Sequence, residues 1–315
     1  MKKTLWLFIP LALIVAFLVL RVSSDQKETV TNTASSISTN PTTEVPDGLS
    51  LSVSPSTVLQ GNPAEISING LDSVSTIESL SLDGRLLHVF LYDGKPTALI
   101  GIDLRGKTGP YELVLTLEDG QKIEKKLMVG ARIITKAPLT IPDKLGGNTP
   151  EAEKKLISTL AEEGSIISSI PTSAEMLWSG PFRFPLSDPI VVTDIYGYTR
   201  LTGGSTISHK GTDFQAAIGT PVYAMNSGLV RFVGNLRNYG NTVVLDHGLE
   251  LLTIYMHLSE VNVKVGDTLK KGDFIGKSGD TGYVLGPHLH ITVRIGGISV
   301  DPMKFMELLG PKSEL

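Results

Sequence analysis

The sequence predicts a mainly β chain that combines an N-terminal membrane helix, two β-rich domains and one connecting helix. Three observations lead to this prediction. An apolar run follows the first residues, short alternating segments separated by Gly-containing turns fill two long regions, and helix-capping signals stand between these regions. A chain of 315 residues is longer than one average domain, which agrees with two folded units and connectors.

The first element is a membrane helix at residues 1–22. Two lysines precede an apolar run from Leu5 to Leu20 that only Pro10 interrupts. At about 1.5 Å per residue this run nearly spans a hydrocarbon core of roughly 30 Å. Lysines before the run predict that the remainder of the chain lies outside the membrane. Because no small-x-small cleavage site follows, we expect a retained anchor, and a cleaved signal of an exported protein is the alternative.

A flexible tether and a small β domain come next. Residues 23–48 are rich in Ser, Thr, Asn and Pro and lack the apolar side chains that a core needs. In residues 49–134 the segments Glu65–Asn69 and Tyr111–Glu118 alternate with period two, and several Asp-Gly pairs mark turns. This pattern predicts a small β-sandwich, immunoglobulin-like in architecture only, since the Cys and Trp hallmarks of that fold are missing.

Residues 135–181 are expected to be a linker that contains one helix. Thr149 is a suitable N-cap and Pro150 suits the first turn. Ala152, Leu156 and Leu160 would share one face, which predicts a packing or spacer helix.

Residues 182–310 are again β-rich and contain many glycines, and this part is expected to form the second folded domain. Its candidate strands are Gly228–Gly234, Asn241–Asp246, Glu250–His257, Phe274–Lys277 and His290–Ile295.

Composition limits the chemistry. The chain has no cysteine, so a disulfide framework and a thiolate metal site are both excluded, and any metal must use His and carboxylate ligands. The formal net charge of −4 provides no basic field, so we expect no nucleic-acid partner.

Two short motifs carry candidate metal ligands. In His288-Leu-His290 both imidazoles would project to one face of an extended strand. His209 and Asp213 are four residues apart in a segment whose Gly211 favours a strand or turn over a helix. Together the motifs supply three candidate ligands for a divalent metal, with imidazole left over for proton transfer. Zinc with three protein ligands and an open fourth position is typical of a hydrolytic site.

The strand that ends at His257 is expected to form the floor of a cleft. Strict alternation places Thr253, Tyr255 and His257 on one face, and Leu252, Ile254 and Met256 on the other.

The motif region resembles the lysostaphin-type (LytM-like) zinc metallopeptidases, which cut peptide bonds in bacterial peptidoglycan. The resemblance covers roughly residues 190–302, and the motifs occur in the family's order. They are His209-Lys-Gly-Thr-Asp-Phe214, Tyr239-Gly-Asn-Thr-Val-Val-Leu-Asp-His-Gly248, Tyr255-Met-His-Leu-Ser259, Val265-Gly-Asp-Thr-Leu-Lys-Lys-Gly-Asp-Phe-Ile-Gly276, Gly279-Asp-Thr-Gly282, Gly286-Pro-His-Leu-His290 and Val300-Asp-Pro302.

The resemblance implies specific roles for these residues. His209, Asp213 and His290 would bind one Zn²⁺ ion, and His257 and His288 would be the catalytic residues beside it. One of the two would act as general base or as oxyanion stabiliser, and their roles stay open. The implied fold is a two-sheet antiparallel β structure with an open groove, which Tyr239, Asn241 and Tyr255 are candidates to line.

The function implied is a zinc-dependent endopeptidase that hydrolyses peptide bonds in peptidoglycan stem peptides or cross-links at the cell surface. It would be membrane-anchored in the cell envelope, with peptidoglycan peptides as substrate and a regulator of wall synthesis or division as a further partner. One alternative is a non-catalytic wall binder, or an activator of a wall amidase, that retains a metal site.

Two further hypotheses concern other segments. Val265–Asp273 is similar to the hairpins of biotin and lipoyl carriers, but it lacks their Met-Lys-Met-like motif. A latent enzyme, in which the tether, helix or first β domain offers zinc a fourth ligand, is a further hypothesis.

Overall fold

The computed structural model describes residues 48–187, 189–201 and 206–312. These residues belong to a compact unit that spans Glu44–Leu315. The predicted membrane helix at 1–22 and all but the last residue of the 23–48 tether lie outside the described residues. Among the residues that are described, neither α1 (Pro150–Ser168) nor α2 (Pro302–Leu309) combines the length and apolar character that a membrane crossing requires.

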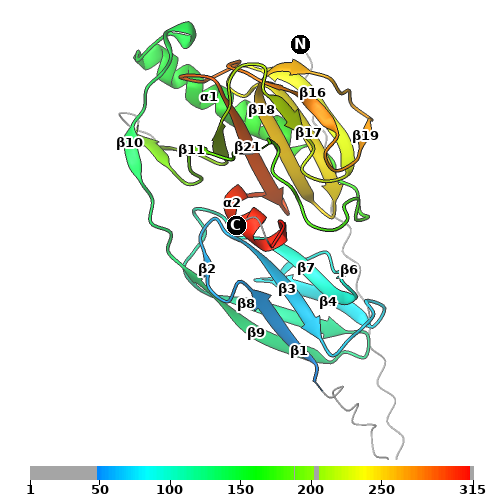
Figure 1. The fold of residues 1–315 in the computed structure, drawn as a ribbon. Helices are drawn as coiled ribbons and strands as arrows, with labels where there is room; N and C mark the ends of the chain where they lie inside the picture. Colours follow the sequence, from blue (N-terminus) through cyan, green and yellow to red (C-terminus); the bar gives the residue numbers. More distant parts are fainter. Residues whose placement is uncertain (1–47, 188, 202–205, 313–315) are drawn as a thin grey trace, which may run out of the picture. The chain divides into compact units, whose positions relative to one another are not determined.

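Two β-sheets enclose the core of the first β domain (Figure 1). The four-stranded sheet runs in the order β1 (Ser50–Ser54), β3 (Pro63–Asn69), β7 (Lys95–Gly101) and β6 (Phe90–Tyr92). The five-stranded sheet runs in the order β2 (Val58–Leu59), β9 (Lys122–Gly130), β8 (Gly109–Leu117), β4 (Ile77–Leu82) and β5 (Arg85–Leu86).

The predicted Asp-Gly turns join neighbouring strands of these sheets. Asp83 and Gly84 connect β4 to β5 with φ angles of 48° and 79°, and Asp93 and Gly94 connect β6 to β7 with 47° and 76°. Two successive positive φ angles give the turn a twist that matches the twist of the strands, and Asp-Gly tolerates them well.

The remaining strands form one large and one small sheet. The large sheet has the order β11 (Val192–Asp194), β14 (Thr212–Gln215), β21 (His288–Ile295), β18 (Leu251–Val261), β17 (Gly240–Gly248), β16 (Gly228–Leu236) and β19 (Thr268–Leu269). It also includes β15 (Pro221–Tyr223), β20 (Phe274–Ser278) and β22 (Ile298–Val300), and all its pairs are antiparallel. The small sheet contains β10 (Lys136–Pro138), β12 (Thr199–Leu201) and β13 (Thr206–Ser208).

The five strands predicted in this region are all present, within a few residues of the expected bounds. The small sheet differs from the implied antiparallel structure in one pair, because β10, which precedes residues 182–310, pairs with β12 in parallel. β10 also belongs to residues 135–181, which were expected to be a linker with a helix only. Three residues are too few to show period-two alternation, and their partner strand is remote in the sequence.

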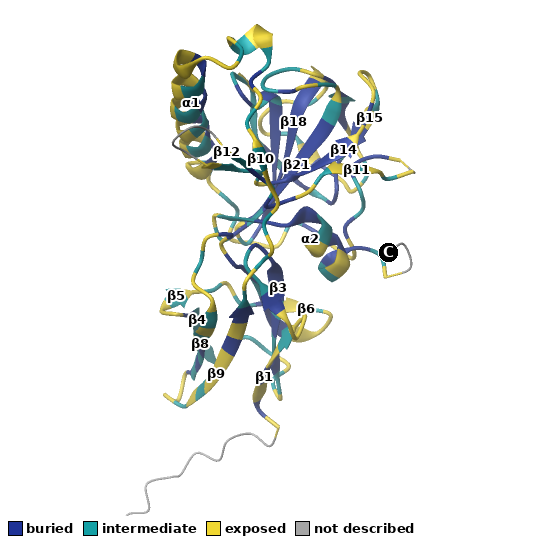
Figure 2. Cartoon of the chain, turned by 90° about the vertical axis from the view of Figure 1, so that its left-hand side faces the viewer, coloured by how far each residue is buried: buried dark blue, intermediate teal, exposed yellow. Residues whose placement is uncertain are grey.

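The two faces of the large sheet carry different apolar clusters. One face packs a large core that includes Phe182, Leu289, Ile291 and Phe305. On the other face, Ile167 of α1 packs with Val244, Leu252, Ile254 and Met256. The central strands are therefore buried on both sides, as the dark ribbons of β18 and β21 in Figure 2 show.

Both helices begin with a side-chain cap. The predicted start of α1 is confirmed, since Thr149 accepts a hydrogen bond from the amide of Ala152 and Pro150 is the first helical residue. α2 was not predicted, although Asp301 accepts hydrogen bonds from the Met303 and Lys304 amides and precedes Pro302. A short helix (Asp143–Leu145) precedes α1.

Candidate metal centre

Three adjacent strands bring the candidate side chains together. In the register between β14 and β21, Asp213 lies opposite His290, and in that between β18 and β21, Met256 lies opposite His290. Directly opposed residues share a face, and residues two apart on a strand do so as well. Asp213, His288 and His290 therefore project from the face of the large sheet against which α1 packs.

His209 reaches the same point from the segment between β13 and β14. Its backbone amide donates to the Tyr198 carbonyl, and its own carbonyl accepts from the Gly197 amide. Gly211 allows the next strand to approach, because a Cβ atom there would lie 2.3 Å from His290 Nε2. The expectation that this motif is not helical is confirmed, since β14 begins at Thr212.

The atoms His209 Nε2, Asp213 Oδ1 and His290 Nδ1 form a tight triangle. The three separations are 3.1 Å from His209 to Asp213, 3.0 Å from His209 to His290 and 2.7 Å from His290 to Asp213. Tetrahedral zinc ligands at about 2.0–2.1 Å from the ion stand roughly 3.3 Å apart. The donor set of two imidazoles and one carboxylate, and its spacing, therefore fit one zinc ion. Among the described His, Cys, Asp and Glu residues, none supplies a fourth ligand to this group.

Hydrogen bonds hold one nitrogen of each histidine in the site. Nδ1 of His209 lies 2.9 Å from the Ile195 carbonyl oxygen, and Nε2 of His290 lies 2.9 Å from Thr292 Oγ1. When these nitrogens donate, the other nitrogen of each ring keeps its lone pair for a metal.

The two remaining imidazoles are oriented in the same manner. His257 Nδ1 lies 2.8 Å from the Thr281 carbonyl oxygen, and His288 Nδ1 lies 2.9 Å from the Gly286 carbonyl oxygen. Both Nε2 atoms are left for chemistry. His288 Nε2 is 3.6 Å from Asp213 Oδ2, and the rings of His257 and His288 are 4.9 Å apart.

The alternation predicted for β18 is wrong at His257. The backbone of this residue has a φ of 62°, and the register between β17 and β18 shifts next to it. This bulge turns the imidazole away from the face of Tyr255 and toward His288 and His290. A positive φ is rare for a residue other than Gly, so alternation alone could not predict it.

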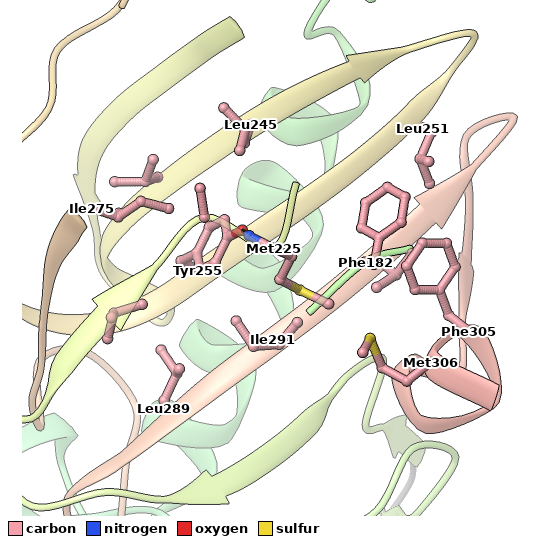
Figure 3. Packing of buried hydrophobic residues seen from close by; sticks show 14 of the residues in the cluster. Phe182, Met225, Leu245, Leu251, Tyr255, Ile275, Leu289, Ile291, Phe305 and Met306 are labelled. Atoms are coloured by element: carbon pink, nitrogen blue, oxygen red, sulfur yellow. Dashed lines mark hydrogen bonds between the residues drawn. The ribbon is translucent and has the colours of Figure 1, made fainter. Parts of the chain in front are cut away.

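Tyr255 does not line a groove, which corrects the sequence expectation. Its side chain is fully buried in the core on the opposite face of the sheet, where Figure 3 shows it beside Met225 and Ile275. The hydroxyl accepts hydrogen bonds from the Met225 amide and from Thr253 Oγ1. The physical reason is that Tyr255 follows the regular alternation, whereas His257 departs from it.

The other two groove candidates lie nearer the site. Tyr239 is half-buried against the cluster that contains Ile167 and Met256, and its carbonyl accepts from the His257 amide. The side-chain amide of Asn241 donates to the Leu258 carbonyl, and its backbone amide donates to Thr281 Oγ1. Their contact with a substrate stays a prediction.

Burial and hydrogen bonding set the charges of the site. Burial alone would raise the pKa of the Asp213 carboxyl, but hydrogen bonds from His209 and His290 outweigh it and hold this pKa well below its usual range. Burial lowers the pKa of His290, and it lowers that of His257 well below 6.5, where the neighbouring imidazoles add to the effect. At neutral pH the site therefore offers the Asp213 carboxylate and the neutral imidazoles of His257 and His290. At His209 burial would lower the pKa, but the hydrogen bond to Asp213 outweighs it and raises this pKa.

Sequence reasoning missed the residues that orient these side chains. Ile195, Gly286 and Thr281 act through backbone carbonyls, which leave no sequence signal. Thr292 could have been found, because it continues the polar face of His288 and His290 at the same two-residue spacing. His247 lies outside the metal centre, where it is buried and hydrogen-bonded to the Ser227 carbonyl and Thr253 Oγ1.

Comparisons with known proteins agree with this geometry. Residues 207–302 match the model of peptidase family M23. Peptidoglycan DD-endopeptidase ShyA of Vibrio cholerae is 31% identical over 203 residues, which cover 61% of this chain and 46% of ShyA. Peptidoglycan DD-endopeptidase ShyB of the same organism is 41% identical over 170 residues, 50% of this chain and 39% of ShyB. The match therefore spans less than half the length of either relative.

A solved structure is similar over most of the chain. A Pseudomonas aeruginosa protein assigned to peptidase M23 superposes with a TM-score of 0.57 at 26% sequence identity. The match covers 79% of this chain and 94% of that protein, so it extends well beyond the residues that carry the metal centre.

Proposed function

We propose that this chain, whose residues 207–302 match the model of peptidase family M23, is a zinc-dependent endopeptidase that hydrolyses peptide bonds in bacterial peptidoglycan. The relatives named peptidoglycan DD-endopeptidases support the substrate class. Stem peptides and their cross-links are the candidate bonds.

One observation carries the proposal. His209 Nε2, Asp213 Oδ1 and His290 Nδ1 converge within 3.1 Å of one another, and two further imidazoles stand beside them. A zinc ion held by these three residues would supply a Lewis acid able to polarise a peptide carbonyl and to lower the pKa of water to roughly 7.

The chain's own histidines would carry out the proton transfers. His257 is neutral at pH 7, and the Thr281 carbonyl fixes its Nδ1, so its Nε2 can accept a proton from the attacking water. His288 presents Nε2 at 3.6 Å from Asp213 Oδ2 and, in its doubly protonated form, would donate a hydrogen bond to the oxyanion that develops on the substrate. A protonated imidazole would then help the amine to leave.

The test is the release of new amino groups from purified peptidoglycan, with and without a chelator. We expect release by the wild-type protein, loss of release with chelator and recovery with zinc. His290→Ala removes a ligand and should abolish both zinc binding and release. Equal release by this variant would refute the mechanism, and zinc binding without any release would favour a non-catalytic wall binder.

The proposed substrate also bears on location. Peptidoglycan lies outside the cytoplasmic membrane, which agrees with the anchor predicted at residues 1–22 and with the relatives' activity on the cell wall. We therefore place the chain in the cell envelope as part of this proposal. A protein regulator of wall synthesis or division remains a proposed partner.

A further inference from the structure

Strand β21 has one apolar and one polar face. Leu289, Ile291, Val293 and Ile295 enter the large core. The intervening residues on the opposite face are all polar: His288, His290, Thr292 and Arg294. The cluster against which α1 packs lies on this polar side, and Thr292 stands opposite Ile254 of that cluster.

Apolar packing does not explain why residue 292 carries a hydroxyl group. Thr292 is only 4% exposed, and its neighbour across the sheet is apolar. Within the described part of the chain, Nε2 of His290 is the one hydrogen-bond partner of its Oγ1, at 2.9 Å. Burying a hydroxyl is unfavourable unless it is hydrogen-bonded, so this bond accounts for the residue.

The bond also determines which nitrogen of His290 faces the metal centre. Nδ1 lies 2.7 Å from Asp213 Oδ1 and 3.0 Å from His209 Nε2, on the side where the ligands converge. A metal at Nδ1 requires that the proton of the neutral ring resides on Nε2. The Thr292 hydroxyl can accept that proton in a hydrogen bond and fix the orientation of the ring.

We propose that Thr292 is a positioning residue for the metal centre: its hydroxyl holds His290 in the tautomer and ring orientation that present Nδ1 to zinc. This inference rests on the proposed metal site. It assigns to Thr292 a share of the zinc affinity, although the residue itself touches neither metal nor substrate.

The chain contains a matched pair that serves as control. Thr253 Oγ1 lies 2.8 Å from Nε2 of His247, and both residues are buried on the opposite face of the sheet. Thr253→Val removes a Thr–His hydrogen bond at a histidine that is not part of the metal centre. It should lower stability without a change in zinc affinity.

The experiment measures the zinc dissociation constant of the full chain by competition with a chelator at pH 7. Thr292→Val keeps the shape and β-propensity of the residue but removes the hydroxyl. We expect its zinc affinity to fall about tenfold to a hundredfold, and Thr292→Ser to remain within roughly threefold of wild type. The metal-free proteins are compared by thermal unfolding, and Thr292→Ala replaces the valine variant if the latter does not fold.

Three results would overturn the inference. Thr292→Val could bind zinc as tightly as wild type, Thr292→Ser could be as weak as Thr292→Val, or Thr253→Val could lose as much affinity as Thr292→Val. A wild-type protein that binds no zinc would overturn the metal site itself. A wild-type protein that binds zinc without cleaving peptidoglycan would overturn only the proposed function, since affinity is measured independently of cleavage.

Discussion

At the level of single residues, the site depends on pairing each imidazole with a fixed acceptor. Ile195, Gly286 and Thr281 supply backbone carbonyls, and Thr292 supplies a hydroxyl. His209 and His290 thus direct their other ring nitrogen toward the three clustered ligand atoms, and His257 and His288 direct theirs to the space beside this cluster. The hydrogen bond to one ring nitrogen therefore determines which nitrogen remains available for metal binding or proton transfer.

His257 should contribute to catalysis without contributing to zinc binding. Its Nε2 is free, and it is not one of the three clustered ligands. We expect His257→Ala to retain one zinc per chain and to lose about 10²- to 10⁴-fold in kcat, the usual contribution of a general base. The measurement is kcat on purified cross-linked muropeptides together with zinc content.

His88→Ala is the matched control for this prediction, because the His88 side chain is 50% exposed and lies near Glu250, outside the site. It should keep full activity. If His257→Ala were as active as wild type, the chain would not use His257 as a base, and the binder or activator hypothesis would gain support.

His247 should make the stability of the protein pH-dependent. Burial lowers its pKa to about 4, whereas the unfolded chain titrates near 6.5. Between these values the unfolded state binds more protons, so stability is complete above pH 6.5 and falls as the pH drops toward 4. At 1.36 kcal/mol per pKa unit the loss is roughly 3 kcal/mol.

The measurement is urea unfolding of metal-free protein between pH 4.5 and 7. Wild type should lose stability more steeply than His247→Asn, which starts lower but lacks this titration. If the free energy of unfolding changed with pH to the same extent in the two proteins, His247 would not be the cause of the pH dependence. Both proteins keep the other buried histidines, so the contribution of those residues cancels in the comparison.

How far the sequence could predict the site also differs from residue to residue. The two-residue spacing of His288 and His290 predicted a shared face, because a regular strand places such residues on one side. The four-residue spacing of His209 and Asp213 did not define their geometry, since His209 lies before β14 begins. The assumption of strict alternation led both to the assignment of Tyr255 to the groove and to the wrong face for His257. The positive φ angle of His257 turns its side chain to the other face of the sheet, and neither residue propensity nor sequence periodicity predicts such an angle.

At the level of elements, α1 supports the face of the large sheet that carries the candidate metal centre. Glu163 accepts hydrogen bonds from the Asn238 amide, and Thr159 Oγ1 accepts one from the Asn238 side chain. The next residue, Tyr239, accepts from the amide of His257. The hydrogen bond between Glu163 and the Asn238 amide, together with that between the Tyr239 carbonyl and the His257 amide, thus connects α1 to His257.

Glu163 should therefore affect turnover more than zinc binding. Glu163→Ala removes the acceptor for the Asn238 amide and lets the segment that holds His257 shift. Since small displacements of catalytic groups are costly, we expect kcat to fall roughly tenfold with zinc content unchanged. Glu163→Gln keeps one oxygen acceptor and should stay near wild type, and the exposed Glu162→Ala is the control on the same helix.

A rise in activity for Glu163→Ala would contradict this supporting role and would indicate a latent enzyme that α1 restrains. Deleting everything before residue 182 is a poorer test of latency. It would expose Leu252, Ile254 and Met256, which Ile167 of α1 helps to bury.

The elements that the sequence did not reveal are the short ones. β10 has three residues and a distant partner, so its pairing depends on tertiary structure. α2 did have local signals, an Asp cap followed by Pro, but its eight residues adjoin a strand-rich region. Long segments with a clear period, such as β16, β17, β18 and α1, were correctly predicted.

At the level of the whole molecule, the described chain contains two large apolar cores, and the second also includes Phe90 of the first β domain. One lies within the first β domain and includes Ile66 and Leu113, and the other lies on the large sheet that carries the metal centre. Trp178 belongs to the second core, where its ring packs against Phe90 at 5.5 Å. It is 3% exposed, so its fluorescence should report the unfolding of that core.

Zinc should stabilise the second core by an amount that does not depend on the first. A ligand at a hundred times its dissociation constant adds about 2.7 kcal/mol to the free energy of unfolding. Ile66 is fully buried in the first core, and Ile66→Ala should lower stability by about 2–5 kcal/mol. Substitutions that share no contacts with the ligands are additive, so the zinc increment should be the same in this variant as in wild type.

The increment is measured by Trp178 fluorescence during urea unfolding in zinc-buffered and chelated solutions. Trp6 is the other tryptophan of the chain, and Trp6→Phe leaves Trp178 as the single reporter. In this background His290→Ala should abolish the increment, whereas Ile66→Ala should preserve it. If Ile66→Ala reduced the increment as well, the first β domain would be energetically coupled to the metal centre. The role of the first β domain would then include control of the metal centre.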